Sequence, residues 1–413
     1  MARRGGFVEE FRETAPTPGK TMTKKVTAEE LVDRARSMIH TLRERAKHAD
    51  ALRRVPDETI ADFKEAGLFK AVQPKRYGGY ELDPAVIYDI QLELGRGCAS
   101  SAWVFGVLSV HSWQLALFPK ETQDEVWGDD PSVLIGSSYM PVGKTKWVDG
   151  GVELTGRWSF SSGCDHCDWT FLGSFVPTPE GAPPDMRTLL LPRRDYEIID
   201  NWYVTGLKAS GSKDIEVKGA FVPDHHMHKF SDGFKQSSPG NEVNTSPVYR
   251  YPFGQIHVRS VSTPALGAAL GALEDYVDFM KTKVSQATGG KATDSFVNNF
   301  SAAEAAAKLD REILVLRRNF REMFSLIEKG EPIPLDRRVR FRYDSARAVS
   351  TAVEVVDELF TNSGGRVLFE GNALNRAFQD VHAIRQHHAN GIEKPGLNFG
   401  AVQFGGRNTD FFI

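Results

Sequence analysis

Residues 152–166 read VELTGRWSFSSGCDH, and the periodicity of this stretch decides the fold. Apolar and polar residues alternate over residues 152–160, and a period of two predicts a half-buried strand. The apolar members are Val152, Leu154, Trp158 and Phe160. The strand ends in Ser161-Ser162-Gly163, which offers hydroxyl groups and open backbone N–H groups beside aromatic rings. An ordinary strand-end turn explains the same residues without a function.

Similar short runs at 169–176, 187–191 and 214–222, separated by Gly, Pro and Asp, extend the strand into a small β-domain. Helical spacing dominates on both sides of it. Before it, the predicted helices are 27–42, opened by a capping box of Thr27 and Glu30, then 57–66, 84–95 and 99–118. After it they are 301–330, opened by Ser301 and Glu304, then 337–362 and 372–388.

This order of elements predicts an α+β fold with helices on either side of a β-domain. We expect a disordered tail at 1–25, a helical domain at 26–130 and a β-domain at 131–229. A polar surface loop at 230–254 and a C-terminal helical bundle at 255–413 follow.

Composition excludes several classes of protein. The 413 residues carry a formal net charge of −3, so no strong field attracts nucleic acid or an anionic membrane. No apolar run approaches the roughly 18 residues of a membrane span. Three cysteines argue against a disulfide framework. A cytoplasmic enzyme is the expected class.

Common cofactor and metal motifs are missing or weak. The sequence has neither a GxGxxG after a strand nor a phosphate-binding Walker loop, which disfavours a nicotinamide site. Cys164 and Cys167 form a CxxC without a second ligand pair, so no metal is expected. The cluster His225-His226-x-His228 is interpreted as a solvated loop. Gly267 and Gly271 lie in an apolar helical stretch and are predicted to permit close helix packing.

Four segments contain residue types that are unusual for their positions. Trp103 and His111 are eight residues apart, so on a helix they lie near one face. Residues 136–139 read GSSY, residues 158–166 contain the Ser-Ser-Gly end of the strand, and residues 379–390 read QDVHAIRQHHAN. Each is unremarkable on its own: a core aromatic residue and a capped histidine explain the first, a polar turn the second and a strand-end turn the third.

Together, and in this order, the four segments resemble the acyl-CoA dehydrogenase fold, and within it the flavin-dependent oxygenase branch. The resemblance covers about residues 52–390 and includes LRRVPDETI at Leu52, QPKRYGG at Gln73 and DYEIIDNWYVTGLKASGS at Asp195. The relatives most similar in these motifs hydroxylate p-hydroxyphenylacetate or the phenol ring of a 3-hydroxy-9,10-secosteroid. The resemblance implies an N-terminal helical domain, a β-barrel-like central domain and a C-terminal four-helix bundle.

The resemblance also implies a function. It predicts the oxygenase component of a two-component monooxygenase, which takes FMNH₂ or FADH₂ from a separate NAD(P)H-flavin reductase. Such enzymes hydroxylate a phenolic aromatic with O₂ through a C4a-hydroperoxyflavin and are usually homotetramers. A hydrogen bond near the flavin and exclusion of water would protect that intermediate, and a neutral histidine suits activation of a phenol.

Site residues carry over one at a time. The resemblance predicts that Ser162 hydrogen-bonds the flavin, that His111 faces the substrate phenol, and that His387 handles protons. Ser137 is predicted to contact both substrate and flavin. The remaining predicted flavin contacts are Trp103, Ser138, Tyr139, Phe160, Ser161, Lys283, Gly365, Arg366, His387 and His388, with Gly365 and Arg366 serving a neighbouring subunit. We expect residues 246–257 and the C-terminus to line the substrate pocket.

The chain departs from its relatives at three places. Lys283 replaces an arginine, which keeps the charge but loses bidentate geometry. In the steroid-type enzymes an aspartate lies four residues after the histidine that matches His387, and this chain has Gly391 there. The ending FGGRNTDFFI differs from the endings of both relatives. Alternatives are an N- or S-oxidising monooxygenase of the same fold, an acyl-CoA dehydrogenase or nitroalkane oxidase, and a non-enzymatic scaffold. A dehydrogenase is disfavoured for the following reason. His388 lies eight residues after Asp380, at the position where dehydrogenases of this fold usually have the glutamate that removes the substrate proton.

Overall fold

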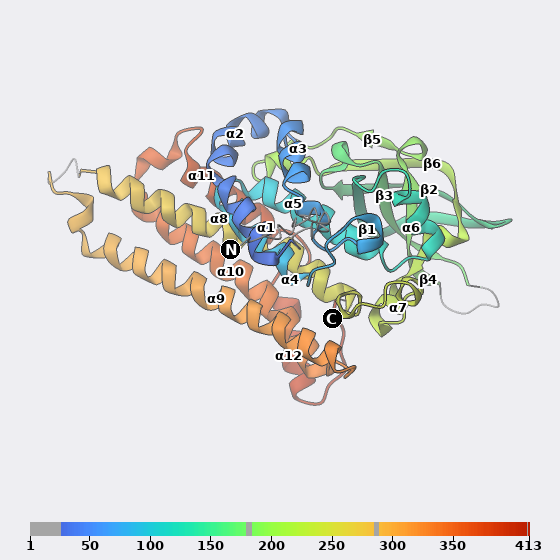
Figure 1. Ribbon diagram of the computed structural model, residues 1–413. Helices are drawn as coiled ribbons and strands as arrows, with labels where there is room; N and C mark the ends of the chain where they lie inside the picture. Colours follow the sequence, from blue (N-terminus) through green and yellow to red (C-terminus); the bar gives the residue numbers. More distant parts are fainter. Residues whose placement is uncertain (1–25, 179–183, 285–288, 411) are drawn as a thin grey trace, which may run out of the picture.

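The computed structural model describes residues 26–178, 184–284, 289–410 and 412–413, so the predicted tail at 1–25 lies outside the described residues. The N-terminal helices are α1 (Ala28–Ser37), α2 (Ile39–Leu52), α3 (Asp57–Glu65), α4 (Ala85–Gly97), α5 (Ala99–Leu115) and α6 (Lys120–Trp127). The capping box of Thr27 and Glu30 is confirmed at the start of α1. Every residue of α5 is buried, which fits a helix that is apolar on all sides and lies between other layers (Figure 1).

The central part of the chain forms a seven-stranded sheet in the order β5-β6-β2-β1-β3-β4-β7. Its strands are β1 (Ile135–Val148), β2 (Gly151–Ser161), β3 (Trp169–Val176), β4 (Asp185–Pro192), β5 (Glu197–Ile199), β6 (Lys213–Pro223) and β7 (Met227–Lys229). Among the strand pairs of the described residues, only β1–β3 is parallel. The predicted strand at 152–160 is confirmed as β2, with Val152, Leu154 and Trp158 buried.

The alternation of β2 fails at one residue, and the failure shapes the site. Phe160 was expected on the buried face, but 63 % of its surface is exposed and its φ is +67°. The register of β2 against β6 shifts between Trp158 and Ser161. This bulge turns the aromatic ring out and buries Ser161 instead.

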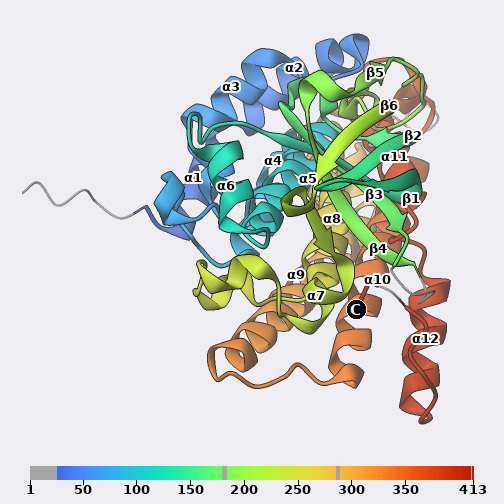
Figure 2. The same cartoon turned by 90° about the vertical axis from the view of Figure 1, so that its right-hand side faces the viewer.

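The C-terminal helices are α7 (Phe230–Lys235), α8 (Phe253–Thr282), α9 (Phe296–Glu328), α10 (Leu335–Ser363), α11 (Ala373–Arg385) and α12 (Glu393–Gln403). Figure 1 shows α8, α9 and α10 running side by side away from the sheet, and Figure 2 shows α12 projecting from the body. Gly267 and Gly271 of α8 pack against the backbone of α4, as predicted. A Cβ atom on Gly267 would lie 2.8 Å from the Cα of Gly95.

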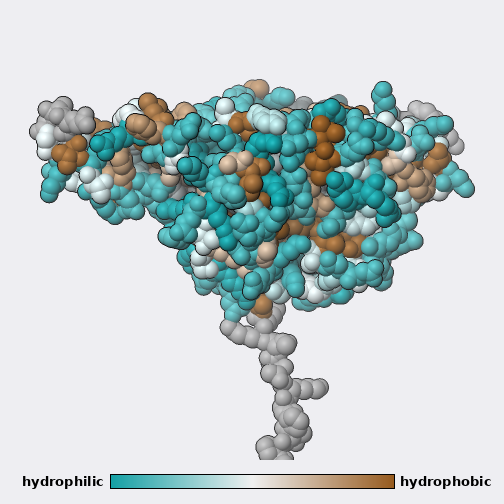
Figure 3. All heavy atoms as spheres, turned by 90° about the horizontal axis from the view of Figure 1, so that it is seen from above, coloured by the Kyte–Doolittle hydropathy of each residue, from teal (hydrophilic) through white to brown (hydrophobic). Residues whose placement is uncertain are grey.

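Two local predictions are wrong. The segment 230–254, expected as a surface loop, contains α7 and is tied to the core, because the Asn244 side chain donates to the Ala116 carbonyl at 2.8 Å. Ser301 does not open a helix: α9 begins five residues earlier with Ser295 as its N-cap, and Ser301 accepts a hydrogen bond from Asn362. No helix among the described residues is long and apolar enough to cross a membrane, and Figure 3 shows one face covered mostly by hydrophilic side chains.

Candidate active site

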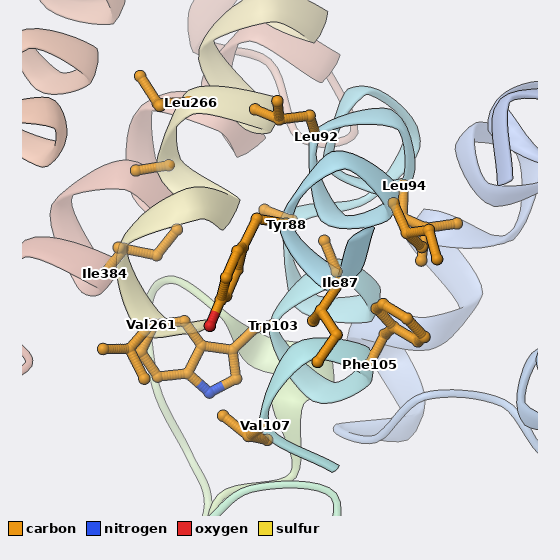
Figure 4. Packing of buried hydrophobic residues seen from close by; sticks show 14 of the residues in the cluster. Ile87, Tyr88, Leu92, Leu94, Trp103, Phe105, Val107, Val261, Leu266 and Ile384 are labelled. Carbon is orange, nitrogen blue, oxygen red and sulfur yellow. The ribbon is translucent and has the colours of Figure 1, made fainter. Parts of the chain in front are cut away.

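A cavity of about 790 Å³ lies where α5, the sheet, α8 and α11 meet. Its walls come from stretches far apart in the sequence. The lining residues include Trp103, Val107, Ser137, Ser138, Tyr139, Phe160, Ser162, Trp202, Leu207, Ser212, His257, Val261, His387, His388 and Phe412. Figure 4 shows the Trp103 indole between Val107 and Val261. The walls are mainly apolar with a few polar groups, as in most sites for small organic ligands.

A chain of hydroxyl groups crosses one wall. The Trp103 Nε1–H donates to Ser162 Oγ at 2.9 Å, Ser162 Oγ shares a hydrogen bond with Ser212 Oγ at 2.7 Å, and Ser212 Oγ bonds Ser210 Oγ at 2.7 Å. An indole N–H only donates, so Ser162 must accept from Trp103. If Ser212 also donates to Ser162, the Ser162 hydroxyl proton is free to point into the cavity. In that arrangement the chain of hydroxyl groups leaves one hydrogen-bond donor in an apolar wall.

Phe160 and Trp202 form the aromatic part of the same wall. Their ring centroids lie 6.2 Å apart with the rings nearly perpendicular. The left-handed backbone of Phe160 is unusual for a bulky residue, and such strain is retained mainly at functional sites. Leu207, also in the cavity wall, has a φ of +50°.

Asp380 of α11 holds Leu207 in place. The Leu207 N–H donates to Asp380 Oδ1 at 2.7 Å, and the Asp380 carboxyl is buried. Burial raises the pKa of Asp380 to about 7, against the lowering effect of the Leu207 hydrogen bond. Asp380 does not line the cavity, so it is a positioning residue for this wall.

The hydroxyl-rich segment after α6 forms the start of β1. Ser137, Ser138 and Tyr139 all line the cavity. Ser138 Oγ donates to the Ser159 carbonyl at 2.8 Å, which joins β1 to the end of β2. The Tyr139 hydroxyl donates to the Gln114 side chain, and burial raises the pKa of Tyr139, so the phenol stays protonated.

Three histidines face the cavity from α8 and the end of α11. The ring of His387 lies 5.6 Å from that of Trp103 and 6.0 Å from that of His257, and His388 is adjacent. Burial and the neighbouring histidines lower the pKa of His387 well below its usual value, and burial lowers the pKa of His257 to about 3. All are therefore neutral near pH 7. The Ala389 N–H donates to His387 Nδ1 at 3.3 Å, so the neutral ring carries its proton on Nε2.

His111 lies behind the cavity wall. It is buried, its ring is 6.1 Å from that of Tyr139 and 5.8 Å from that of Phe171, and it is absent from the residues that line the cavity. Its Nδ1–H donates to the Ile135 carbonyl, which leaves Nε2 as the acceptor. Burial lowers the pKa of His111 to about 4.

Four other predicted site residues also lie outside the cavity lining. Ser161 is fully buried beside Ser162. Lys283 Nζ donates to the Ser363 carbonyl at 2.8 Å, next to the loop that contains Gly365 and Arg366. Figure 1 shows this end of α8 at the tip of the helical bundle, away from the sheet.

Sequence reasoning missed some wall residues and anticipated others. Residues 246–257 and the C-terminus were expected to line the pocket, and they supply His257 and Phe412, whose rings lie 5.5 Å apart. Trp202 and Ser212 were not identified. Both lie within the motif 195–212 that carried the family resemblance, which was the available signal.

Comparisons with known proteins agree with this geometry. Residues 26–129 match the family model for the acyl-CoA dehydrogenase N-terminal domain, and residues 260–391 match the model for its C-terminal domain. The oxygenase subunit HsaA of a flavin-dependent monooxygenase from Rhodococcus jostii (strain RHA1) is 39 % identical over 92 % of this chain and 100 % of the relative. The oxygenase component of p-hydroxyphenylacetate 3-hydroxylase from Acinetobacter baumannii is 31 % identical over 88 % of this chain and 86 % of the relative.

A solved structure gives the same result. The crystal structure of 3-HSA hydroxylase from Rhodococcus sp. RHA1 superposes with a TM-score of 0.89 at 38 % identity, and the match covers 93 % of this chain and 99 % of the other.

Proposed function

This chain belongs to the acyl-CoA dehydrogenase family, among the oxygenase components of flavin-dependent monooxygenases, and we propose that it hydroxylates a phenolic aromatic with reduced flavin and O₂. The observation that carries the proposal is the cavity that places Ser162 between Trp103 and the aromatic pair Phe160–Trp202. Of the two relatives named above, the one from Rhodococcus jostii is a flavin-dependent monooxygenase by name, and the one from Acinetobacter baumannii hydroxylates p-hydroxyphenylacetate, a phenol, by name.

The cavity fits a flavin ring with a small aromatic beside it. Its volume lies within the roughly 300–1,000 Å³ of typical ligand sites, and its walls are aromatic with few polar groups. Reduced FMN or FADH₂, when bound, supplies the activation of O₂. The protein's part is to exclude water with Trp103, Phe160 and Trp202, and to present the Ser162 hydroxyl as a hydrogen-bond donor.

Neutral histidines would manage the protons. With its Nδ1 occupied by the Ala389 N–H, His387 can donate from Nε2 into the cavity. His257 and His388 also line the cavity and stay neutral near pH 7, so a ring nitrogen of either can accept a hydrogen bond from the phenol hydroxyl. His111, predicted to face the phenol, is not among the lining residues; its ring packs 6.1 Å from that of Tyr139, which is.

The cavity does not suit a dehydrogenase. Among the described residues, none of those that line the cavity is Asp or Glu, and removal of an α-proton from an acyl thioester needs such a base. The histidines and hydroxyl groups that line the cavity can instead hydrogen-bond a phenol and an oxygen-derived ligand.

A direct assay tests the proposal. The purified protein, supplied with reduced FMN or FADH₂ by a separate NADH-dependent flavin reductase, should add one oxygen atom to members of a phenol panel, detected by mass spectrometry. The reductase alone should yield only H₂O₂. If the protein purifies with tight FAD that an acyl-CoA bleaches, or if only amines or sulfides are oxidised, the proposal is wrong.

We further propose a homotetramer located in the cytoplasm. Support for assembly comes from large apolar side chains that are exposed in the single chain. Phe296, Val297, Phe300, Leu368 and Phe369 lie at or near the ends of α9 and α10 that adjoin the end of α8, and Leu397 and Phe404 lie in and just after α12. Lys283, Gly365 and Arg366, near the first five, would then contact flavin bound to a neighbouring subunit. Cys98, Cys164 and Cys167 are free thiols, in keeping with a reducing compartment. Light scattering after size-exclusion chromatography and cell fractionation test the two statements.

A further inference from the structure

A second group of chemically active side chains lies outside the cavity, where α6 meets the turn before β7. Glu125 belongs to α6, and His225 and His226 belong to a short 3₁₀ turn, Asp224–His226. Glu125 Oε1 lies 2.8 Å from His225 Nε2, and Glu125 Oε2 lies 2.7 Å from His226 Nε2. One ligand atom from each residue lies within 4.8 Å of the other two.

The solvated loop expected for these histidines is wrong. The side chains of His226 and His225 are only 7 % and 25 % exposed. The His226 ring packs 5.7 Å from that of Trp169 and also interacts with the backbone of Leu190. Thr122 Oγ1 donates to the His225 carbonyl and ties the turn to α6. Packing and hydrogen bonds thus hold both imidazoles toward one carboxylate.

The three ligand atoms suit a divalent transition metal. Imidazole nitrogen binds Zn²⁺ at about 2.0–2.1 Å and carboxylate oxygen at about 2.0–2.2 Å, and two histidines with one carboxylate and water form a common zinc set. Ligand atoms at those distances lie about 3.4 Å apart in a tetrahedron. The two N···O distances must widen by several tenths of an ångström, and the 42 %-exposed Glu125 side chain has room to rotate.

The surroundings of the site resemble those of known metal ligands. A metal-bound histidine usually donates its second ring nitrogen to a fixed acceptor, which sets the ring orientation. The contact between the His226 ring and Leu190 fulfils this condition. The exposed side of Glu125 leaves room for water to complete the coordination shell.

We propose that Glu125, His225 and His226 bind one divalent cation of the zinc class per chain. None of the three lines the cavity, so the metal takes no part in the oxygenase reaction. The cation would join α6 to the turn that leads into β7, and a ligand that binds only the folded chain raises its stability.

Isothermal titration calorimetry with Zn²⁺ tests the proposal on EDTA-treated, full-length protein without a polyhistidine tag. We expect one Zn²⁺ per chain and a melting temperature that rises with Zn²⁺ concentration. Glu125→Gln and His225→Ala should each weaken binding at least tenfold. His40→Ala is the matched control, since His40 is exposed and forms an ion pair at 3.5 Å with Glu44. The Zn²⁺ affinity of this variant should equal that of the unmodified protein.

A measurement on the unmodified protein tests the proposal even where the variants do not fold. X-ray absorption of the zinc-loaded chain should count two imidazole ligands. Absence of binding, equal affinity in Glu125→Gln and His225→Ala, or a site with fewer than two imidazoles would overturn the proposal.

Discussion

Replacement of Ser162 by alanine tests the central feature of the cavity. The change removes the acceptor of the Trp103 N–H bond at 2.9 Å and the partner of Ser212 at 2.7 Å. Trp103 is only 5 % exposed, so its N–H is left without a partner where water reaches poorly. An unpaired buried donor costs about 1–3 kcal/mol, which is the expected loss in the free energy of unfolding.

The same change removes the hydrogen-bond donor that faces the ligand. A hydrogen bond to a charged or strongly polarised group contributes about 1.5–3 kcal/mol, and each 1.4 kcal/mol corresponds to a factor of ten. The ratio of hydroxylated product to released H₂O₂ should therefore fall roughly 10- to 100-fold. Chromatography measures the product, and a peroxidase-coupled assay measures the peroxide.

Ser109→Ala provides the matched control. Ser109 lies on the same helix as Trp103, is fully buried, and its hydroxyl has no hydrogen-bond partner among the described residues. Its removal should leave the product ratio unchanged and cost little stability. If Ser162→Ala kept the normal ratio, or if Ser109→Ala lowered it equally, the role given to Ser162 would be refuted.

Three further changes test other parts of the molecule. Phe412→Ala opens a wall of the cavity and should raise kcat/KM for bulky phenols relative to small ones by roughly tenfold. The control is Phe404→Ala, which removes a ring that is 93 % exposed and should leave that ratio unchanged. The unfolding free energy of the Asp380→Asn variant, relative to that of the unmodified protein, should increase as pH rises from 3.8 to about 7. Above pH 7 this difference should stay constant. The raised pKa means that the folded chain retains a proton the unfolded chain has released, so the wild type loses stability over that window; urea unfolding at pH 5 and pH 8 checks this. Gly267→Ala should cost about 1–3 kcal/mol because its Cβ would meet the backbone of α4, while Gly400→Ala, with open space around it, should be neutral or slightly stabilising by thermal melting.

Much of the architecture was predictable from periodicity. The strand 152–160 and the glycine contacts of α8 follow from local pattern and small side-chain volume, and both are confirmed. β1 was missed because Gly136, Pro141 and Gly143 interrupt its alternation, and its register against β3 shifts between Ser138 and Gly143. Neighbouring strands hold such a segment extended although its own pattern is weak.

The site was predictable where it depends on a motif and unpredictable where it depends on packing. The family resemblance assigned Trp103 and Ser162 to one flavin site although they lie 59 positions apart in the sequence, and in the structure a hydrogen bond joins them. It did not foresee that a bulge would turn Phe160 outward, or that His111 would lie behind Tyr139. The pairing of Glu125 with two histidines a hundred positions away has no local signature at all.

The composition of the cavity wall has a consequence for biosynthesis. Trp103 of α5 and His387 after α11 line the same cavity although 284 positions separate them. During synthesis the cavity therefore cannot be complete before His387 and Phe412 have left the ribosome, and the earlier helices must fold first without a ligand. Once the wall is assembled, a ligand at a hundred times its dissociation constant would add about 2.7 kcal/mol to the stability of the fold, because it binds the folded chain and not the unfolded one.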